Sequence, residues 1–263
     1  MRVYACALAI SLALAFPAEA TPRRVASLDL CTDELVLLLA APGQLISVSR
    51  VGGDPQDNVL AARTKGLHLN DGSIVSVAGL SSDLVVTMGG GGRDRKRLAR
   101  ALGSQLVNVP PPQRIEDVRD NVRLVATALG RDQAGEALIR WMDGALGSVP
   151  KNQKDAILLG GNGASVPADG LAAEWLSHAG LSQRALPGDR AEIADVLAEP
   201  PQILVTSSYR SNQVSLGQMW LKHPALRRLP ATTRRVSIDG RAWTCLGPLV
   251  AQGVTNLRRH IRP

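Results

Sequence analysis

The sequence predicts an α/β protein built from two lobes, and three observations lead to this fold class. Short apolar runs alternate with helical patterns along most of the chain, which is typical of parallel sheets covered by helices. A purely helical stretch interrupts this alternation near the middle of the chain. The pattern of the first half then returns in the second half, which favours two similar lobes over one continuous sheet.

Residues 1–20 have the composition of a secretory signal peptide. Arg2 supplies a positive charge, residues 3–16 form a short apolar run, and Ala18-Glu19-Ala20 fits a cleavage site. The run is too short for a helix that spans a membrane. We therefore expect cleavage after Ala20 and export of a soluble mature protein to the periplasm.

Residues 21–112 are expected to form the first lobe. Thr32 is the expected N-cap of its first helix, because the acidic residues Asp33 and Glu34 follow in the first turn. A Gly/Pro/Asp-rich loop is expected at 50–57 and a glycine loop at 89–92. The expected strands are 24–28, 45–48, 84–87 and 106–109, and the expected helices are 33–40, 74–78 and 93–102.

Residues 113–150 are expected to be a helical connector, and residues 151–263 the second lobe. Apolar side chains keep helical spacing from Ile115 to Leu129, and again from Ala134 to Ala145. The second lobe has expected strands at 157–159, 203–206 and 236–238 and expected helices at about 171–179 and 248–259. The helix-loop-strand pattern of residues 74–87 recurs 119 residues later, at 193–206.

The net charge is +7, from 30 Lys and Arg against 23 Asp and Glu. A positive net charge can favour binding to nucleic acid, to acidic lipid or to an anionic ligand. We expect no nucleic-acid partner, because an exported protein rarely meets one and no basic run is interleaved with aromatic residues. The densest basic cluster, residues 93–100, is interpreted as a solvated helix face, part of which could look into a cleft.

Cys31 and Cys245 are the two cysteines that remain after cleavage. In an oxidising compartment such a pair is a candidate disulfide. Two separate thiols are the next interpretation, and a thiolate pair that grips a soft metal is the last.

Motifs along the whole mature chain resemble those of one family, the periplasmic solute-binding proteins of ABC importers for iron-siderophores and cobalamin. They are Arg24-Val25-Ala26-Ser27-Leu28 and Thr32-Asp33-Glu34-Leu35 near the start; Ser82-Asp83-Leu84-Val85-Val86; and His223-Pro224, Leu229-Pro230-Ala231, Asp239, Trp243, Gly247 and Pro248 near the end. The resemblance implies two Rossmann-like lobes with parallel sheets joined by a long helix. It also implies a monomer without catalytic activity or a resident cofactor, which binds a small molecule between its lobes and delivers it to the importer's membrane subunits.

In this fold the loops that follow the strands face the cleft. The candidate ligand-binding residues on these loops are Arg50, Arg93, Asn162, Ser165, Tyr209, Arg210, Arg241 and Trp243. The planar guanidinium group of arginine is suited to binding anionic oxygens, although each of these arginines could instead be a solvated charge on a loop. The glycines at 89–92 could present N–H groups to an anion or form a plain turn. The arginines point to an anionic ligand, so a ferric siderophore is the main interpretation, with a corrinoid or haem as alternatives. The low aromatic content, 3% of the chain, counts against cobalamin.

Direct metal binding by histidine is not expected, because none of the four histidines lies in these loops; they are His68, His178, His223 and His260. No recognised catalytic motif is present, so the alternative from another class is a thiol-dependent enzyme using Cys31. The resemblance further implies one acidic docking residue on each lobe for the importer. The nearest candidates are Asp71 and Asp195.

Overall fold

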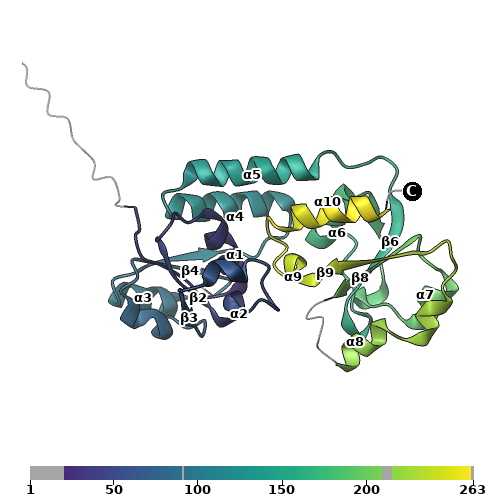
Figure 1. Cartoon of the computed structure of the whole chain (residues 1–263), viewed down its shortest axis with the longest axis horizontal. Coiled ribbons are helices and arrows are strands. Elements are labelled where there is room, and N and C mark those ends of the chain that lie inside the picture. Colours follow the sequence, from purple (N-terminus) through teal and green to yellow (C-terminus); the bar gives the residue numbers. More distant parts are fainter. Residues whose placement is uncertain (1–20, 91, 209–214, 262–263) are drawn as a thin grey trace, which may run out of the picture.

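The protein consists of two α/β lobes side by side, with a pair of helices lying across both (Figure 1). The structure is a computed structural model and describes residues 21–90, 92–208 and 215–261. The expected signal peptide and the candidate residues Tyr209 and Arg210 lie outside the described residues. Within those residues, no helix has both the length and the apolar character needed to cross a membrane.

The N-terminal lobe contains a five-stranded parallel sheet in the order β3-β2-β1-β4-β5. Its central strands are buried because helices cover both faces. Val25, Leu84 and Val86 pack on one face against α1 and the connector, while Ala26 and Val85 pack on the other. The elements are β1 Val25–Ser27, α1 Leu30–Leu39, β2 Leu45–Ser49, α2 Arg50–Gly53, β3 His68–Asn70, β4 Leu84–Met88, α3 Arg93–Ala101 and β5 Gln105–Val109, with 3-10 helices η1 Ala61–Thr64 and η2 Val75–Leu80.

The C-terminal lobe contains a four-stranded parallel sheet in the order β7-β6-β8-β9. The predicted repeat is confirmed, because β4 and β8 occupy equivalent places, each between the first strand of its lobe and the strand that follows it in sequence. The elements are β6 Lys154–Leu159, α6 Leu171–His178, β7 Leu181–Gln183, α7 Ile193–Ala198, β8 Ile203–Ser208, α8 Leu216–Leu221, β9 Arg234–Asp239, α9 Gly240–Trp243 and α10 Val250–Ile261, with 3-10 helices η3 Gly161–Gly163, η4 Pro187–Asp189 and η5 Pro224–Arg228.

The connection that the resemblance implied as one long helix is an antiparallel pair, α4 Ile115–Ala128 and α5 Asp132–Leu146. Both helices cross from one lobe to the other (Figure 1). Ile115, at the start of α4, belongs to the core of the C-terminal lobe, whereas Val125 belongs to the core of the N-terminal lobe. On α5 the order is reversed, with Ile139 in the first core and Leu146 in the second. The pair therefore contributes to both cores and holds the lobes together.

Three local expectations differ from the structure. Helix α1 begins at Leu30, with Asp29 as its N-cap: the Asp29 carboxylate accepts a hydrogen bond from the Thr32 backbone N–H, and Thr32 lies inside the helix. The loop expected at 50–57 begins with the short helix α2. Strands β3 and β7 were not expected, because three residues are too few to show an alternating pattern.

Two glycines of α5 provide a test of how closely the connector helices pack. A Cβ on Gly135 would lie 2.6 Å from the Ala126 Cβ, whereas a Cβ on Gly144 would meet nothing within 4 Å. Replacing a glycine inside a helix by alanine gains about 0.5–1 kcal/mol when there is room. We therefore expect Gly144→Ala to raise the free energy of unfolding by that amount, and Gly135→Ala to lower it by about 1–3 kcal/mol through overpacking. Urea unfolding of both variants checks this, and equal effects of the two substitutions would contradict the close helix contact.

Candidate functional site

Residues that follow strands of the two sheets meet at the junction of the lobes. Cys31 and Pro55 follow β1 and β2 of the first lobe, while Arg241 and Cys245 follow β9 of the second. Both pairs are in direct contact, Cys31 with Cys245 and Pro55 with Arg241. The carboxyl ends of both sheets therefore face the same interlobe space, as the sequence predicts for the ligand site.

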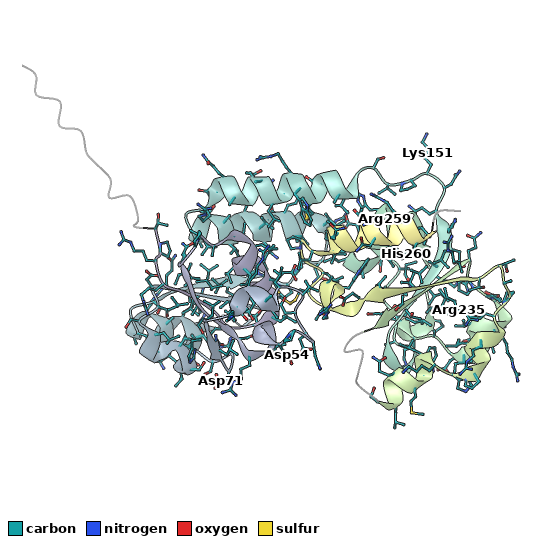
Figure 2. The ribbon with its side chains drawn as sticks, in the orientation of Figure 1. Asp54, Asp71, Lys151, Arg235, Arg259 and His260 are labelled. Atoms are coloured by element: carbon teal, nitrogen blue, oxygen red, sulfur yellow. A yellow bond between two sulfur atoms is a disulfide. The ribbon has the colours of Figure 1, made fainter. Side chains whose placement is uncertain are left out.

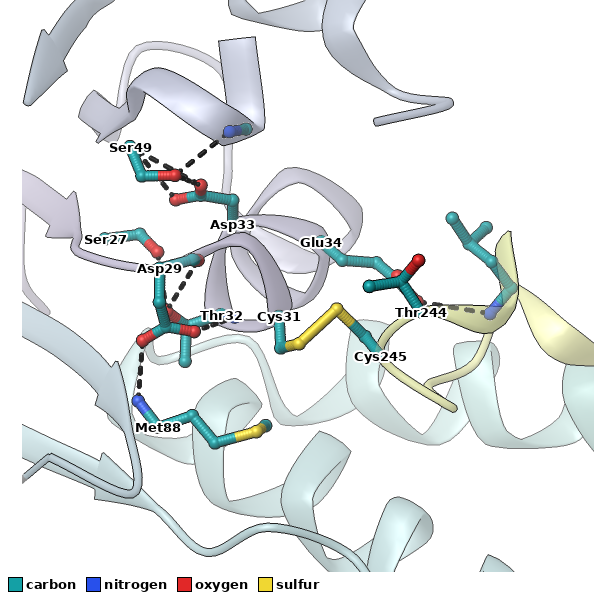
Figure 3. Close-up of a disulfide and its surroundings, with 12 residues drawn as sticks. Ser27, Asp29, Cys31, Thr32, Asp33, Glu34, Ser49, Met88, Thr244 and Cys245 are labelled. Atoms are coloured by element: carbon teal, nitrogen blue, oxygen red, sulfur yellow. Dashed lines mark hydrogen bonds between the residues drawn. A yellow bond between two sulfur atoms is a disulfide. The ribbon is translucent and has the colours of Figure 1, made fainter. Parts of the chain in front are cut away.

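Cys31 and Cys245 form a disulfide between the lobes, which confirms the candidate bridge (Figure 3). Their Cα atoms are 5.2 Å apart, although the residues are separated by 214 positions in sequence. The bond joins the first turn of α1 to the loop after α9. Because Cys31 is bonded to Cys245, it is not a free thiol. The two alternatives that required free thiols, a thiol-dependent enzyme and a thiolate pair that binds a metal, therefore lose their basis.

Glu34 lies beside this disulfide and is buried between the lobes, with 4% of its surface exposed. Its carboxylate accepts a hydrogen bond of 3.3 Å from the Leu249 backbone N–H, just before α10. It also lies against Gly247, where a Cβ would come within 2.7 Å of the Glu34 Oε1. Burial raises the pKa of Glu34 to about 7. The interlobe contact therefore includes a carboxyl that takes up a proton near neutral pH.

Asp33 points from α1 into the first lobe and fixes the turn that carries Arg50. Its carboxylate accepts a hydrogen bond of 2.5 Å from the Ser49 hydroxyl, and that hydroxyl accepts one of 3.0 Å from the Gly52 N–H to cap α2. A Cβ on Gly52 would collide with the Asp33 carboxylate, so this position requires glycine. Burial raises the pKa of Asp33 to about 7, against the opposing effect of the Ser49 hydrogen bonds.

Arg241 forms a contact between the lobes. Its guanidinium pairs with Asp239 at 2.6 Å, and its Nη1 donates a hydrogen bond of 2.7 Å to the carbonyl oxygen of Pro55 in the opposite lobe. The hydrogen bonds from Arg241 hold the pKa of Asp239 below its usual range. This arginine, predicted as a ligand contact, is thus already engaged by two protein partners.

Arg50 and Arg93 are exposed at the first positions of α2 and α3. Sequence reasoning missed two residues of the first lobe, Arg95 and Asp29, that contact the end of β4. Arg95 folds back from α3 so that its Nη1 donates to the Thr87 hydroxyl at 3.3 Å, near the end of β4. Asp29 accepts a 2.7 Å hydrogen bond from the Met88 N–H and so links α1 to the end of β4. The separation of 59 residues between these two partners left no local signal.

Ser165 and Trp243 line one cavity of about 270 Å³ in the second lobe. The Ser165 hydroxyl donates to the Leu158 carbonyl oxygen and accepts from the Gln183 side chain, so it supports the loop rather than projecting freely. Trp243 is buried, and its indole lies close to Gly253 of α10. Asn162, another candidate in this lobe, is exposed in η3, and its carbonyl oxygen accepts a hydrogen bond from Arg190.

The two expected docking residues are both exposed, one on each lobe. Asp71 follows β3 on the side of its lobe that faces away from α5 (Figure 2). Hydrogen bonds from Ser73 lower the pKa of Asp71 to about 2, so this carboxylate stays charged. Asp195 lies in the first turn of α7. Within the described ranges, no three or more His, Cys, Asp or Glu side chains are grouped so that they could hold a metal ion.

No known family profile matches the sequence, and no curated protein matches it either. Solved structures do match across both lobes. A possible iron-binding periplasmic solute-binding protein from Staphylococcus epidermidis has a TM-score of 0.67 at 18% identity, covering 92% of this chain and 100% of that one. The periplasmic heme-binding protein RhuT from Roseiflexus has a TM-score of 0.67 at 20% identity, covering 90% and 97%. The periplasmic vitamin B12-binding protein BtuF of Vibrio cholerae has a TM-score of 0.57 at 14% identity, covering 91% and 97%. The chain has the two-lobed fold that these proteins share.

The two buried carboxyls predict an unusual pH dependence of stability. The pKa values of Asp33 and Glu34 are raised to about 7 in the folded state, above their ordinary values, so the folded protein binds protons that the unfolded chain releases. Stability should therefore rise as pH falls from about 8 to about 5.5, by on the order of a few kcal/mol for the pair.

Urea unfolding at both pH values measures this difference. Asp33→Asn and Glu34→Gln should each reduce it. Asp71→Asn should leave it unchanged, because the pKa of Asp71 is about 2. A wild-type protein that is no more stable at the lower pH would contradict the assignment.

Proposed function

We propose that this chain, which has the fold of the periplasmic solute-binding proteins, is the monomeric binding subunit of an ABC importer and holds an iron-siderophore-type complex between its lobes in the periplasm. The observation that carries the proposal is the pairing of strand-end loops from two parallel sheets across one interlobe space. Ligands of open α/β sheets bind at such carboxyl ends.

Binding without catalysis fits the chemistry of the cleft. Cys31, the nucleophile that the sequence offered, is bonded to Cys245. The buried carboxyls Asp33 and Glu34 have structural partners, Ser49 and Leu249 respectively. The remaining described candidates are arginines, an asparagine, a serine and a tryptophan, which suit recognition.

The connections between the lobes favour a cleft that is largely formed before ligand arrives. The disulfide, the Glu34 and Arg241 hydrogen bonds and the helices α4 and α5 all cross the junction. Each crossing restricts the movement of one lobe relative to the other. A site preformed in this way loses less conformational freedom when it binds.

Arg50 and Arg93 are the arginines that we assign to anionic groups of the ligand. Both are exposed, and neither has a described salt bridge, whereas Arg241 is held by Asp239 and Pro55. Exposed arginines at the mouth of a cleft attract anionic oxygens and can pair with them bidentately. A ferric siderophore with acidic groups meets this requirement.

Haem is the second candidate, and exposed apolar side chains favour it. Val51 on α2 is 46% exposed, and Leu216 and Met219 on α8 are 83% and 56% exposed. Apolar groups at such exposure favour contact with an apolar ligand surface. A porphyrin with two carboxylates would use apolar side chains of this kind as well as the arginines, and RhuT is a structural neighbour that binds heme. A corrinoid, as in BtuF, is the third candidate.

Ligand titration tests the proposal. We expect one saturable 1:1 response in tryptophan fluorescence within a panel of ferric siderophores, haemin and cyanocobalamin. Arg50→Ala and Arg93→Ala should each weaken binding of the responding compound by about tenfold, since each removes a charge-assisted contact. Added salt should reduce the effect. Arg140→Ala, an exposed arginine on α5, is the control. Silence across the panel together with turnover of a substrate would reject the function.

Asp71 and Asp195 are proposed to dock the chain onto arginines of the importer. Reversing both charges with lysine should abolish ligand uptake in cells while ligand affinity of the purified protein stays unchanged. Reversal of Asp94 and Asp169, which are also exposed and lie one on each lobe, is the matched control. Normal uptake by the Asp71 and Asp195 double variant would reject this pair.

A further inference from the structure

The second lobe contains a cavity of about 270 Å³ at the carboxyl ends of β6, β8 and β9. Its wall combines small residues with bulky apolar ones. The small ones include Gly160, Ala164, Ala172 and Gly240, and the bulky ones include Ile238 and Trp243. Small residues at strand ends leave the space open, and Trp243 and Ile238 give it an apolar surface.

Two hydroxyl groups of this wall are already engaged within the protein. The Ser165 hydroxyl donates to the Leu158 carbonyl oxygen at 2.8 Å, and the Thr244 hydroxyl donates to the Gly240 carbonyl oxygen at 2.9 Å. Among the described residues that line the cavity, none is ionisable. A charged or strongly hydrated group placed here would lose its water without a charged partner. The cavity therefore selects an uncharged apolar group.

The size of the cavity limits what it can hold. A cavity of roughly 150 Å³ lined by apolar side chains accepts benzene. A space of about 270 Å³ thus holds one aromatic ring with substituents, whereas whole drug-sized ligands occupy roughly 300–1,000 Å³. Only a part of a metal complex fits, and the rest must remain in the interlobe space.

We propose that this cavity is a subsite for one aryl or alkyl arm of the ligand, with the anionic groups of the same ligand directed to Arg50 and Arg93 of the first lobe. The inference rests on the proposed function and narrows its substrate class to amphipathic metal complexes. Ferric complexes made only of hydrophilic carboxylates, such as ferric citrate, lack the arm that the cavity accepts.

Filling the cavity tests the subsite. Ala172→Leu adds a side chain from α6, and Ala164→Leu adds one from the more exposed loop after β6. Ala231→Leu is the matched control, because Ala231 is exposed in the turn before β9, at the opposite end of the sheet. The probes are the ferric complex of 2,3-dihydroxybenzoate, ferric citrate and 1-naphthoate, which carries an aryl group and a carboxylate without metal.

The aryl complex should bind the unmodified protein about tenfold more tightly than ferric citrate, because it buries an aromatic ring. Either cavity-filling variant should lower the affinity for the ferric 2,3-dihydroxybenzoate complex about tenfold and abolish saturable binding of 1-naphthoate. Ala231→Leu should change neither. Near-UV circular dichroism shows whether each variant is folded. If Ala172→Leu does not fold, Ala164→Leu still tests the subsite.

Equal affinity for both ferric complexes, unaffected by the filling variants, would overturn the subsite and leave the proposed function standing. If neither ferric complex binds, the wider ligand panel decides the proposed function, and 1-naphthoate decides the subsite on its own. The subsite is supported if 1-naphthoate binds the unmodified protein and Ala172→Leu or Ala164→Leu abolishes that binding. It is overturned if 1-naphthoate does not bind, or if neither variant affects its binding.

Discussion

The covalent tie between Cys31 and Cys245 is the constraint on which the geometry of the cleft depends. It closes a loop of 214 residues, and cross-links over long loops restrict the unfolded chain most. In the folded state it holds the start of α1 against the loop before α10, which buries Glu34 next to Leu249. The raised pKa of Glu34 is the electrostatic cost of that burial. The disulfide also holds Pro55 within hydrogen-bond reach of Arg241. The disulfide, the Glu34–Leu249 hydrogen bond and the Arg241–Pro55 hydrogen bond therefore together define how the two sheets face each other.

The two walls of the cleft differ in character. The first lobe contributes the exposed arginines Arg50 and Arg93, and the turn that carries Arg50 is fixed by a buried acid, since Asp33 holds Ser49 and Ser49 caps the helix that begins at Arg50. The second lobe contributes a largely apolar cavity lined by Trp243, in which the Ser165 and Thr244 hydroxyl groups donate to backbone carbonyl oxygens. Under the proposed function, charge recognition and apolar recognition would fall to different lobes. A ligand would then be selected by how its charged and apolar groups are arranged, in addition to which groups it has.

Most of the fold could be predicted from the sequence, because β1, β4, β6 and β8 are buried parallel strands and their apolar runs are visible. The three-residue strands β3 and β7 carry no such signal. Asp29 and Thr32 are both good N-cap residues, and only the backbone, together with the Met88 contact, decides for Asp29. At the site, Ser165 and Trp243, both chosen from their loop positions, line the same cavity. Loop position could not reveal that Arg241 is held by a carbonyl 186 residues away, because that contact exists only after both lobes have folded.

A disulfide between the lobes changes which property of a binding protein would determine its selectivity for ligands. In a binding protein whose lobes open widely, part of the ligand's interaction energy is spent on shifting the population toward the closed form. Here the disulfide and the two crossing helices hold the lobes in place beforehand. Affinity then depends mainly on how well the preformed lining matches the ligand. Under the proposed function, a hydrophilic chelate would contact the arginines alone and leave the apolar cavity empty, whereas an amphipathic complex would contact both walls at once. If the proposed function is correct, the rigidity of the junction and the difference between its walls would together favour an amphipathic ligand.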